Sequence, residues 1–220
     1  MRQHFEGIFE EKQGKKRLFL TESLNPGRKF FDEEVTVIEG KEFRVWDPRS
    51  SKLCSAILKG LSSSPFTKSS KVLYLGCAHG YTVSYLSEIV RSGAVFALDF
   101  APRVFRDFMA LSEARANIIP IIADANKPQS YYHYVPAVDV IFQDVAQPNQ
   151  LEIFLKNCDL FLKKGGIGML ALKARSVDVT KSPNAIFSEV AKALKARMEV
   201  LQQISLEPFQ QDHALFVVRK

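Results

Sequence analysis

The chain has 220 residues, of which 46% are hydrophobic and 25% are charged, and its 30 Lys and Arg against 24 Asp and Glu give a net charge of +6. This composition excludes wholesale disorder and fibrous repeats, and the length fits one ordinary domain with a small addition. No apolar run approaches the roughly 18 residues of a membrane-spanning helix, and the first residues lack a secretory pattern. We therefore expect a cytoplasmic protein with no membrane association.

The three cysteines, Cys54, Cys77 and Cys158, are far apart in the sequence. They form neither a disulfide framework nor a Cys-x-x-Cys metal motif, and the four histidines have no ligand spacing. We predict reduced thiols and no bound metal.

Residues 1–50 are predicted to form a small antiparallel β domain, and residues 51–220 a second domain. Short alternating apolar runs in the first part are broken by turn signals at residues 25–27 and 39–40. The predicted inward-facing positions on its strands are Leu18, Leu20, Val35, Val37 and Phe43. Ser50 is the candidate cap of a helix that runs to about Gly60, and a Ser-rich linker follows.

From Lys71 onward strands and helices alternate. The apolar spacing predicts strands over 72–75, 95–99, 118–122, 138–142 and 167–172, helices over 82–90, 103–116, 151–162 and 184–198, and a closing hairpin over 201–206 and 213–218. Such alternation is typical of an α/β fold, a Rossmann-like parallel sheet with helices on both faces. The aromatic run 131–134 is expected to cover the sheet, with stacking on RNA as the alternative.

A glycine turn follows the first of these strands, with Gly76 and Gly80 in GxxxG spacing. Glycine there lets the backbone approach a ligand. Asp99 ends the next strand, where a carboxylate can accept both hydroxyls of a ribose, and Asp124 follows the third, where it can accept from an adenine amino group. Together they indicate an adenosine-containing cofactor. The absence of GxGxxG favours S-adenosylmethionine over NAD, although a plain strand-to-helix turn also explains the glycines.

Asp144 and Lys173 end the fourth and fifth strands, so both are expected at the cofactor edge of the sheet. An acid and a lysine suit methyl transfer to a hydroxyl, since the nucleophile must lose a proton. The alternatives are a turn cap for Asp144 and a solvated strand end for Lys173.

Several runs resemble one known family: residues 72–84, 117–125, 138–150, 172–180 and 206–213, with residues 144–148 (Asp-Val-Ala-Gln-Pro) the most specific. The sequence resembles fibrillarin, the 2'-O-methyltransferase of box C/D guide ribonucleoproteins, especially its archaeal form, over nearly the whole chain. The resemblance implies that S-adenosylmethionine is bound by Gly76, Ala78, Tyr81, Thr82, Asp99, Phe100, Asp124, Ala125, Asp144, Val145, Ala146 and Gln147. It implies a catalytic set of Lys52, Asp144 and Lys173, with His213 as a fourth member.

The same resemblance implies the partners: a Nop5-type scaffold protein, an L7Ae-type kink-turn binder, a box C/D guide RNA and a target rRNA or tRNA. The glycine turn departs from the family's usual Gly-Ala-Ala-Ser-Gly followed by two threonines, because Cys77, His79 and Tyr81 occupy it here. Asp99 also stands where the family usually has glutamate. The leading hypothesis is an RNA ribose 2'-O-methyltransferase. Its alternatives are a fibrillarin-like subunit with weakened cofactor binding and a stand-alone methyltransferase.

Overall fold

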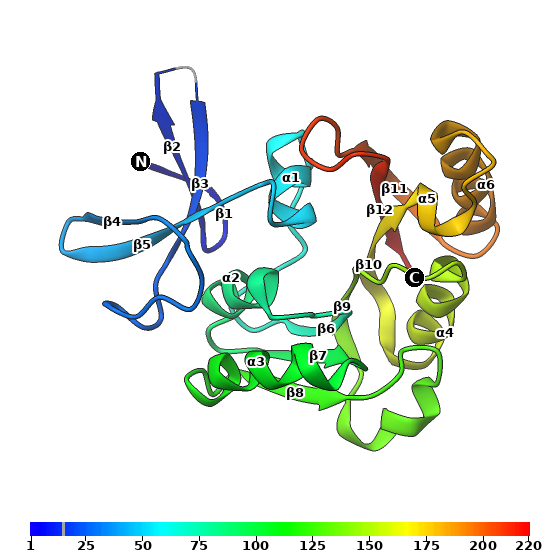
Figure 1. Cartoon of the computed structure of the whole chain (residues 1–220), viewed down its shortest axis with the longest axis horizontal. Coiled ribbons are helices and arrows are strands. Elements are labelled where there is room, and N and C mark those ends of the chain that lie inside the picture. Colours follow the sequence, from blue (N-terminus) through cyan, green and yellow to red (C-terminus); the bar gives the residue numbers. More distant parts are fainter. Residues whose placement is uncertain (15) are drawn as a thin grey trace.

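The computed structural model describes residues 1–14 and 16–220, which form two β-sheets and the helices packed on them (Figure 1). The first sheet is antiparallel and has the order β1-β2-β3-β5-β4. Its strands are β1 (Arg2–Phe5), β2 (Ile8–Gln13), β3 (Lys16–Glu22), β4 (Val35–Ile38) and β5 (Lys41–Trp46). The small N-terminal β element predicted from the turn signals is therefore present.

The small sheet has a core of its own, to which three of the predicted inward positions contribute. These are Leu18, Leu20 and Phe43. The prediction is wrong for Val35 and Val37, which are 37% and 68% exposed. Ile38 packs on the small core instead. β4 is an edge strand whose register is set by β5, and a shift of one residue turns every side chain to the other face.

The first helix, α1 (Lys52–Leu58), begins one residue later than a Ser50 cap predicts. Its cap is Ser51, whose hydroxyl accepts a hydrogen bond from the Cys54 amide at 3.3 Å. The Ser50 hydroxyl donates instead to the Asp47 carboxylate at 3.0 Å. Lys52 consequently occupies the first helical position. The domain boundary at residue 50 stays a prediction and falls in the segment between β5 and α1.

The second sheet has seven strands in the order β11-β12-β10-β9-β6-β7-β8. They are β6 (Lys71–Leu75), β7 (Ala94–Asp99), β8 (Ile118–Ile122), β9 (Val138–Gln143), β10 (Leu162–Lys173), β11 (Glu199–Ser205) and β12 (His213–Arg219). The strands from β8 to β10 are parallel, whereas β12 runs antiparallel to both of its neighbours. The α/β prediction is confirmed, with the closing hairpin as the antiparallel part.

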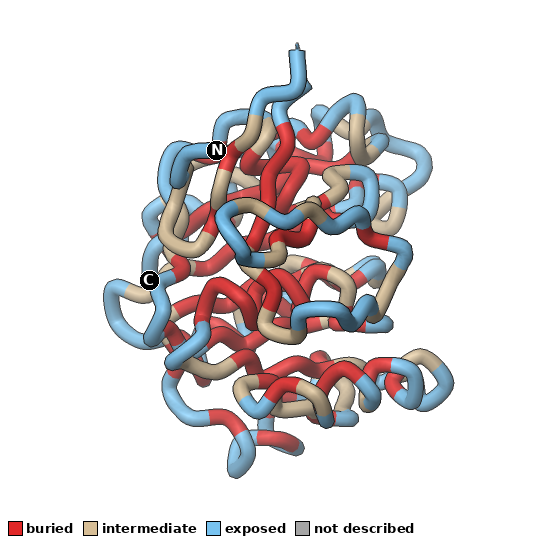
Figure 2. Tube along the Cα trace, turned by 90° about the vertical axis from the view of Figure 1, so that its left-hand side faces the viewer, coloured by how far each residue is buried: buried red, intermediate tan, exposed pale blue. Residues whose placement is uncertain are grey.

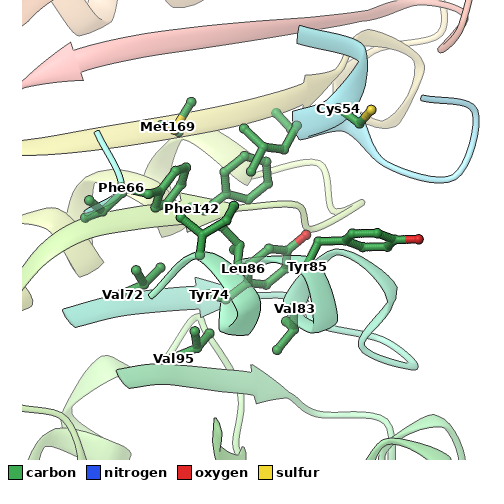
Figure 3. Packing of buried hydrophobic residues seen from close by; sticks show 14 of the residues in the cluster. Cys54, Phe66, Val72, Tyr74, Val83, Tyr85, Leu86, Val95, Phe142 and Met169 are labelled. Carbon is green, nitrogen blue, oxygen red and sulfur yellow. The ribbon is translucent and has the colours of Figure 1, made fainter. Parts of the chain in front are cut away.

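Helices cover both faces of this sheet because successive strand residues are apolar on both sides. In β6, Val72 and Tyr74 join the core cluster beneath α1, α2 (Tyr81–Ile89) and α3 (Pro102–Glu113). Leu73 and Leu75 join the cluster beneath α4 (Gln150–Phe161) and α6 (Pro183–Lys195). Buried residues accordingly run through the middle of the molecule, with exposed residues around them (Figure 2). Figure 3 shows the first cluster, in which the Tyr74 ring stacks on Phe142 with centroids 5.0 Å apart.

Two short elements complete the chain: α5 (Ala174–Val177) and the 3₁₀ segment η1 (Pro128–Tyr134). Tyr131 in η1 is buried and stacks on Phe161 of α4 at 5.4 Å, so this one residue of the aromatic run packs against α4 in the core on that face of the sheet, and a cover made by the whole run stays a prediction. Tyr132 and Tyr134 are 52% and 68% exposed, and stacking on RNA stays a hypothesis for them. Within residues 1–14 and 16–220, no helix combines the length and the apolarity needed to cross a membrane.

A buried charge cluster joins the small sheet to α2. Its members are Arg44, Glu33, Glu88 and Arg115. The Arg44 guanidinium lies 2.9 Å from a carboxylate oxygen of Glu33 and 2.9 Å from one of Glu88, and Arg115 lies 2.6 Å from Glu88. Trp46 adds an apolar contact by stacking on Tyr85 of α2 at 4.9 Å. These contacts place the end of β5, and α1 after it, against the larger sheet.

Candidate active site

The candidate site lies where the strand order of the larger sheet reverses. β6 and β9 are neighbours in space, but the chain leaves them in opposite directions across the sheet, which opens a crevice at their carboxyl ends. A cavity of about 230 Å³ occupies this position. Its wall consists of Gly76, Ala78, Leu98, Asp99, Phe100, Ala125, Asp144, Val145, Ala146 and Gln147. Every member except Leu98 is a predicted cofactor-binding residue.

Gly76 and Gly80 shape the turn that borders the cavity, and both have positive φ, +83° and +87°. A Cβ on Gly76 would lie 2.5 Å from the Asp144 carbonyl oxygen, and one on Gly80 would overlap the ring of Phe108. From the sequence, these glycines were expected to let the backbone approach a ligand. The structure adds a different reason, since neighbouring protein atoms already exclude a side chain at both positions.

Asp99 holds a fixed carboxylate in the cavity wall. One oxygen accepts from the Ala78 amide at 2.9 Å, and the other accepts from the Ala101 amide at 3.0 Å. An ionised carboxylate offers about four lone-pair positions, so each oxygen retains acceptor capacity for a further donor. The end of β7 therefore presents an oriented acceptor pair to the cavity.

Lys52 and Asp144 meet beside this cavity although they are 92 positions apart in the chain. The Lys52 ammonium lies 2.9 Å from both oxygens of the Asp144 carboxylate. Their side chains are 23% and 21% exposed, so the pair is partly shielded from water while one side remains accessible. Ser51 caps α1, so the helix begins at Lys52 itself.

Lys173 and His213 lie directly opposite each other, at the ends of β10 and β12 that meet at the same edge. The His213 Nδ1 lies 2.6 Å from the Gln211 carbonyl oxygen. Because a carbonyl only accepts, Nδ1 carries the hydrogen and Nε2 is left as an acceptor. The pKa of His213 is lowered, chiefly because the ring is buried and also because the positive charges of Lys52 and Lys173 lie near it. The hydrogen bond to Gln211 and the negative charge of Asp144 act in the opposite direction and offset part of this effect. The other three predicted catalytic residues thus all lie within electrostatic reach of His213.

Metal ligands do not gather here or elsewhere in the described part of the chain, where no group of three or more His, Cys, Asp or Glu side chains could hold an ion. Cys54, Cys77 and Cys158 are buried and unpaired with one another. A site that works without metal stays a prediction from the sequence.

Comparison with known proteins identifies the family. The fibrillarin family model matches residues 1–220. The chain belongs to the fibrillarin family. A protein of Thermococcus onnurineus named fibrillarin-like rRNA/tRNA 2'-O-methyltransferase is 50% identical over 214 residues, which cover 97% of this chain and 94% of that protein.

Two solved structures of fibrillarins extend the comparison to the fold. Aeropyrum pernix fibrillarin in complex with natively bound S-adenosyl-L-methionine has a TM-score of 0.90 and 37% identity, covering 99% of this chain and 96% of that one. The fibrillarin chain of a fibrillarin/Nop5p complex has a TM-score of 0.91 and 34% identity, with both chains covered to 100%. The family's fold is therefore shared throughout this chain.

Three of the fibrillarin positions predicted to bind the cofactor do not line the cavity: Tyr81, Thr82 and Asp124. The Tyr81 hydroxyl accepts from the Asp47 amide at 3.2 Å, and the Thr82 hydroxyl donates to the hydroxyl that caps α1. The Asp124 carboxylate accepts from the amide of Asn126 at 2.9 Å. Their binding roles remain predictions. Leu98, which does line the cavity, was not predicted, although its place just before Asp99 at a strand end was the available signal.

The departures from the family's usual glycine turn also point away from the cavity. The side chain of Cys77 is packed in the core beneath α1 to α3, and burial raises the pKa of its thiol. The His79 ring is 59% exposed and lies 3.6 Å from the Asp107 carboxylate. With Tyr81 turned toward Asp47, none of the three changes the wall that faces the cavity.

Proposed function

We propose that this chain transfers the methyl group of S-adenosylmethionine to the ribose 2'-oxygen of rRNA or tRNA. The observation that carries the proposal is the contact between Lys52 and Asp144 beside a cavity walled by predicted cofactor-binding residues. The name of the Thermococcus onnurineus relative and the bound S-adenosyl-L-methionine of the Aeropyrum pernix fibrillarin support it.

The residues of the cavity fit the proposed cofactor. Asp99 offers fixed acceptors that suit the two hydroxyls of a ribose. Leu98, Phe100 and Val145 offer apolar surface that suits a flat base. Asp144 lines the cavity and also pairs with Lys52, so its carboxylate connects the proposed cofactor site with this proposed catalytic lysine. When bound, S-adenosylmethionine supplies an electrophilic methyl group on a positively charged sulfur.

The side chains of the site have distinct tasks in the proposed reaction. Lys173 in its neutral form accepts the proton of the 2'-hydroxyl. Lys52 stabilises the negative charge that develops on the oxygen, and Asp144 fixes the direction of Lys52 through both carboxylate oxygens. Methyl transfer is an in-line displacement, so most of the rate enhancement comes from holding the reacting atoms in line.

His213 supplies a second acceptor at the same edge. The bond from Nδ1 to Gln211 leaves Nε2 unprotonated, and the lowered pKa of the ring keeps it neutral at pH 7. In this form Nε2 is available to accept a hydrogen bond from the substrate hydroxyl and so to orient it. Lys173 remains the proposed base because the family resemblance places it in the catalytic set and its strand ends at the carboxyl edge of the sheet, where the cavity lies; His213 is given the orienting role at the same edge.

We further propose that the chain works in a box C/D ribonucleoprotein with a Nop5-type scaffold, an L7Ae-type kink-turn binder and a guide RNA. The structural relative in the fibrillarin/Nop5p complex supports the scaffold, and the other partners follow from the family resemblance. A protein that recognises an RNA sequence by itself needs a surface that contacts the base edges. A guide RNA removes this need, because it selects the target by base pairing. The alternative of weakened cofactor binding is less favoured, because Cys77, His79 and Tyr81 do not line the cavity.

Reconstitution of the complex tests the proposal. The chain, a scaffold, a kink-turn binder and a guide RNA are mixed with labelled S-adenosylmethionine and a target RNA, and the methylated atom is identified by mass spectrometry of the nucleosides. The expected product is a 2'-O-methylated nucleotide at the guide-specified position, formed much more slowly by the chain alone. Methylation of a base, or equal rates without partners, would reject the corresponding part of the proposal. Calorimetry of the chain with S-adenosylmethionine tests the alternative of a subunit with weakened cofactor binding, since such a subunit would bind the cofactor poorly.

A further inference from the structure

Lys173 is the last residue of β10, and at this point β10 no longer pairs with β9. The ladder between β9 and β10 reaches Gln143 and Leu170, after which β9 ends and the Asp144 amide turns away to the Leu75 carbonyl. On the other side, the Ala174 amide donates across to Asp212, beyond β12. Since the backbone groups of successive residues point to opposite sides of a strand, the N–H and C=O of Lys173 face the vacated β9 side.

Gln150, the first residue of α4, fills the place of the missing strand. Its Oε1 accepts from the Lys173 amide at 3.0 Å, and its Nε2 donates to the Lys173 carbonyl at 3.1 Å. The residue is fully buried, and these are the bonds its amide group makes. Gln143 holds Gln150 in turn, because its side-chain nitrogen donates to the Gln150 carbonyl at 2.7 Å. One side chain thus reproduces the pair of bonds that an adjacent strand would give.

We propose that Gln150 is a positioning residue that sets the direction in which Lys173 leaves the sheet. The proposal rests on the proposed role of Lys173 as the base. A reacting group must be held within about 0.5 Å and 10–20° of its productive geometry, and the lysine amine lies at the end of a long flexible side chain. A small rotation of an unpaired backbone at Lys173 would exceed that tolerance. The two bonds from Gln150 prevent such a rotation without touching the substrate.

A purely structural role for Gln150 makes a different prediction. Buried backbone groups need partners whatever they carry, so loss of the amide would then lower stability and leave the chemistry unchanged. A positioning role affects the chemical step, and specifically the part of the pH profile that Lys173 produces. Rates measured across pH therefore separate the two.

The test uses Gln150→Met, which keeps the length of the side chain and removes both bonds. Single-turnover methylation by the reconstituted complex is followed across pH, with calorimetry for the cofactor and thermal melting of the chain. We expect a rate about 10- to 100-fold lower, which is the usual loss of activity when a residue that orients a functional group is removed. The rise of rate with pH should be displaced, and the cofactor Kd should stay within about threefold, because Gln150 does not line the cavity.

A matched control is Asn117→Leu, which removes two amide-to-backbone bonds at the opposite edge of the sheet. The Asn117 amide donates to the carbonyls of Ser87 at 2.8 Å and Val90 at 3.2 Å. This variant should melt earlier and react at the wild-type rate. A wild-type rate and pH profile for Gln150→Met below its melting temperature would overturn the proposal and leave only a structural role.

Two further variants complete the design. If Gln150→Met does not fold, Gln150→Asn keeps the amide group but shortens the side chain by one methylene, which withdraws both bonds from the Lys173 backbone without adding a charge, so a reduced rate supports the proposal and a wild-type rate overturns it. Lys173→Ala is measured in parallel. An unchanged rate for Lys173→Ala rejects the base itself, whereas a reduced rate together with a normal Gln150→Met rejects only the positioning role.

Discussion

Glu88 holds the charge cluster between the two sheets, and its replacement by glutamine should destabilise the protein strongly. Glu88, Arg44 and Arg115 have side chains that are at most 1% exposed. Glu88→Gln keeps the size of the side chain but leaves two buried guanidinium groups with Glu33 as their remaining carboxylate. Removing one partner of a buried ion pair costs about 3–5 kcal/mol. At roughly 2–4 °C per kcal/mol for a chain of this length, the melting temperature should fall by about 6–20 °C.

Differential scanning calorimetry of the isolated chain at pH 7 measures this loss. The control is Glu189→Gln, which breaks a pair with Lys181 at 2.8 Å whose side chains are 46% and 61% exposed. An exposed pair contributes at most about 1 kcal/mol, so this variant should melt close to the wild type. Equal melting temperatures for the two variants would refute the reasoning, because they would show that Arg44 and Arg115 are compensated without Glu88.

Three further predictions concern the site. Asp99→Ala should weaken S-adenosylmethionine binding by roughly 1.5–3 kcal/mol, the size of a charge-assisted hydrogen bond, with unchanged calorimetric affinity as the contrary result. Lys173→Ala should lower the single-turnover rate by about 10²–10⁴ and remove its rise with pH, while a retained profile would make Lys173 a solvated strand end. His213 has a lowered pKa in the folded chain, so the unfolded chain binds its proton more readily. The stability that it contributes is therefore present above about pH 6.5 and is lost as the pH falls through the lowered value. Melting temperatures between pH 5 and 8 should fall less on the acid side for His213→Gln, and parallel curves would contradict this.

The elements of the larger sheet could be predicted from the sequence because each carries its own signal. Short apolar runs predicted the strands β6 to β10, and the helical spacing of Val83, Leu86 and Val90 predicted α2. The positions of Asp99 and Asp144 at one edge also followed, because the carboxyl ends of parallel strands meet there. The roles assigned to individual residues came from the family resemblance.

Local patterns failed where a neighbour decides the outcome. The alternation in β4 could not show which face turns inward, because an edge strand takes its register from β5. The glycine at position 76 was correctly singled out, yet the atom that requires it is the Asp144 carbonyl oxygen, which follows β9, a strand that is adjacent in the sheet but distant in the sequence. Ser50 was predicted to cap α1, but its hydroxyl is bound to Asp47, and the next residue, Ser51, caps the helix instead.

The sequence by itself determined the class of fold, the order of its elements and the acids at the strand ends, since periodicity and turn residues act over a few positions. Only the tertiary structure decided which of these groups meet. It brought Lys52 to Asp144 across 92 positions, and it set the Gln150 amide against the backbone of Lys173. Both contacts depend on how α1 and α4 pack on the sheet, and packing is fixed by the joint burial of many side chains rather than by any local signal.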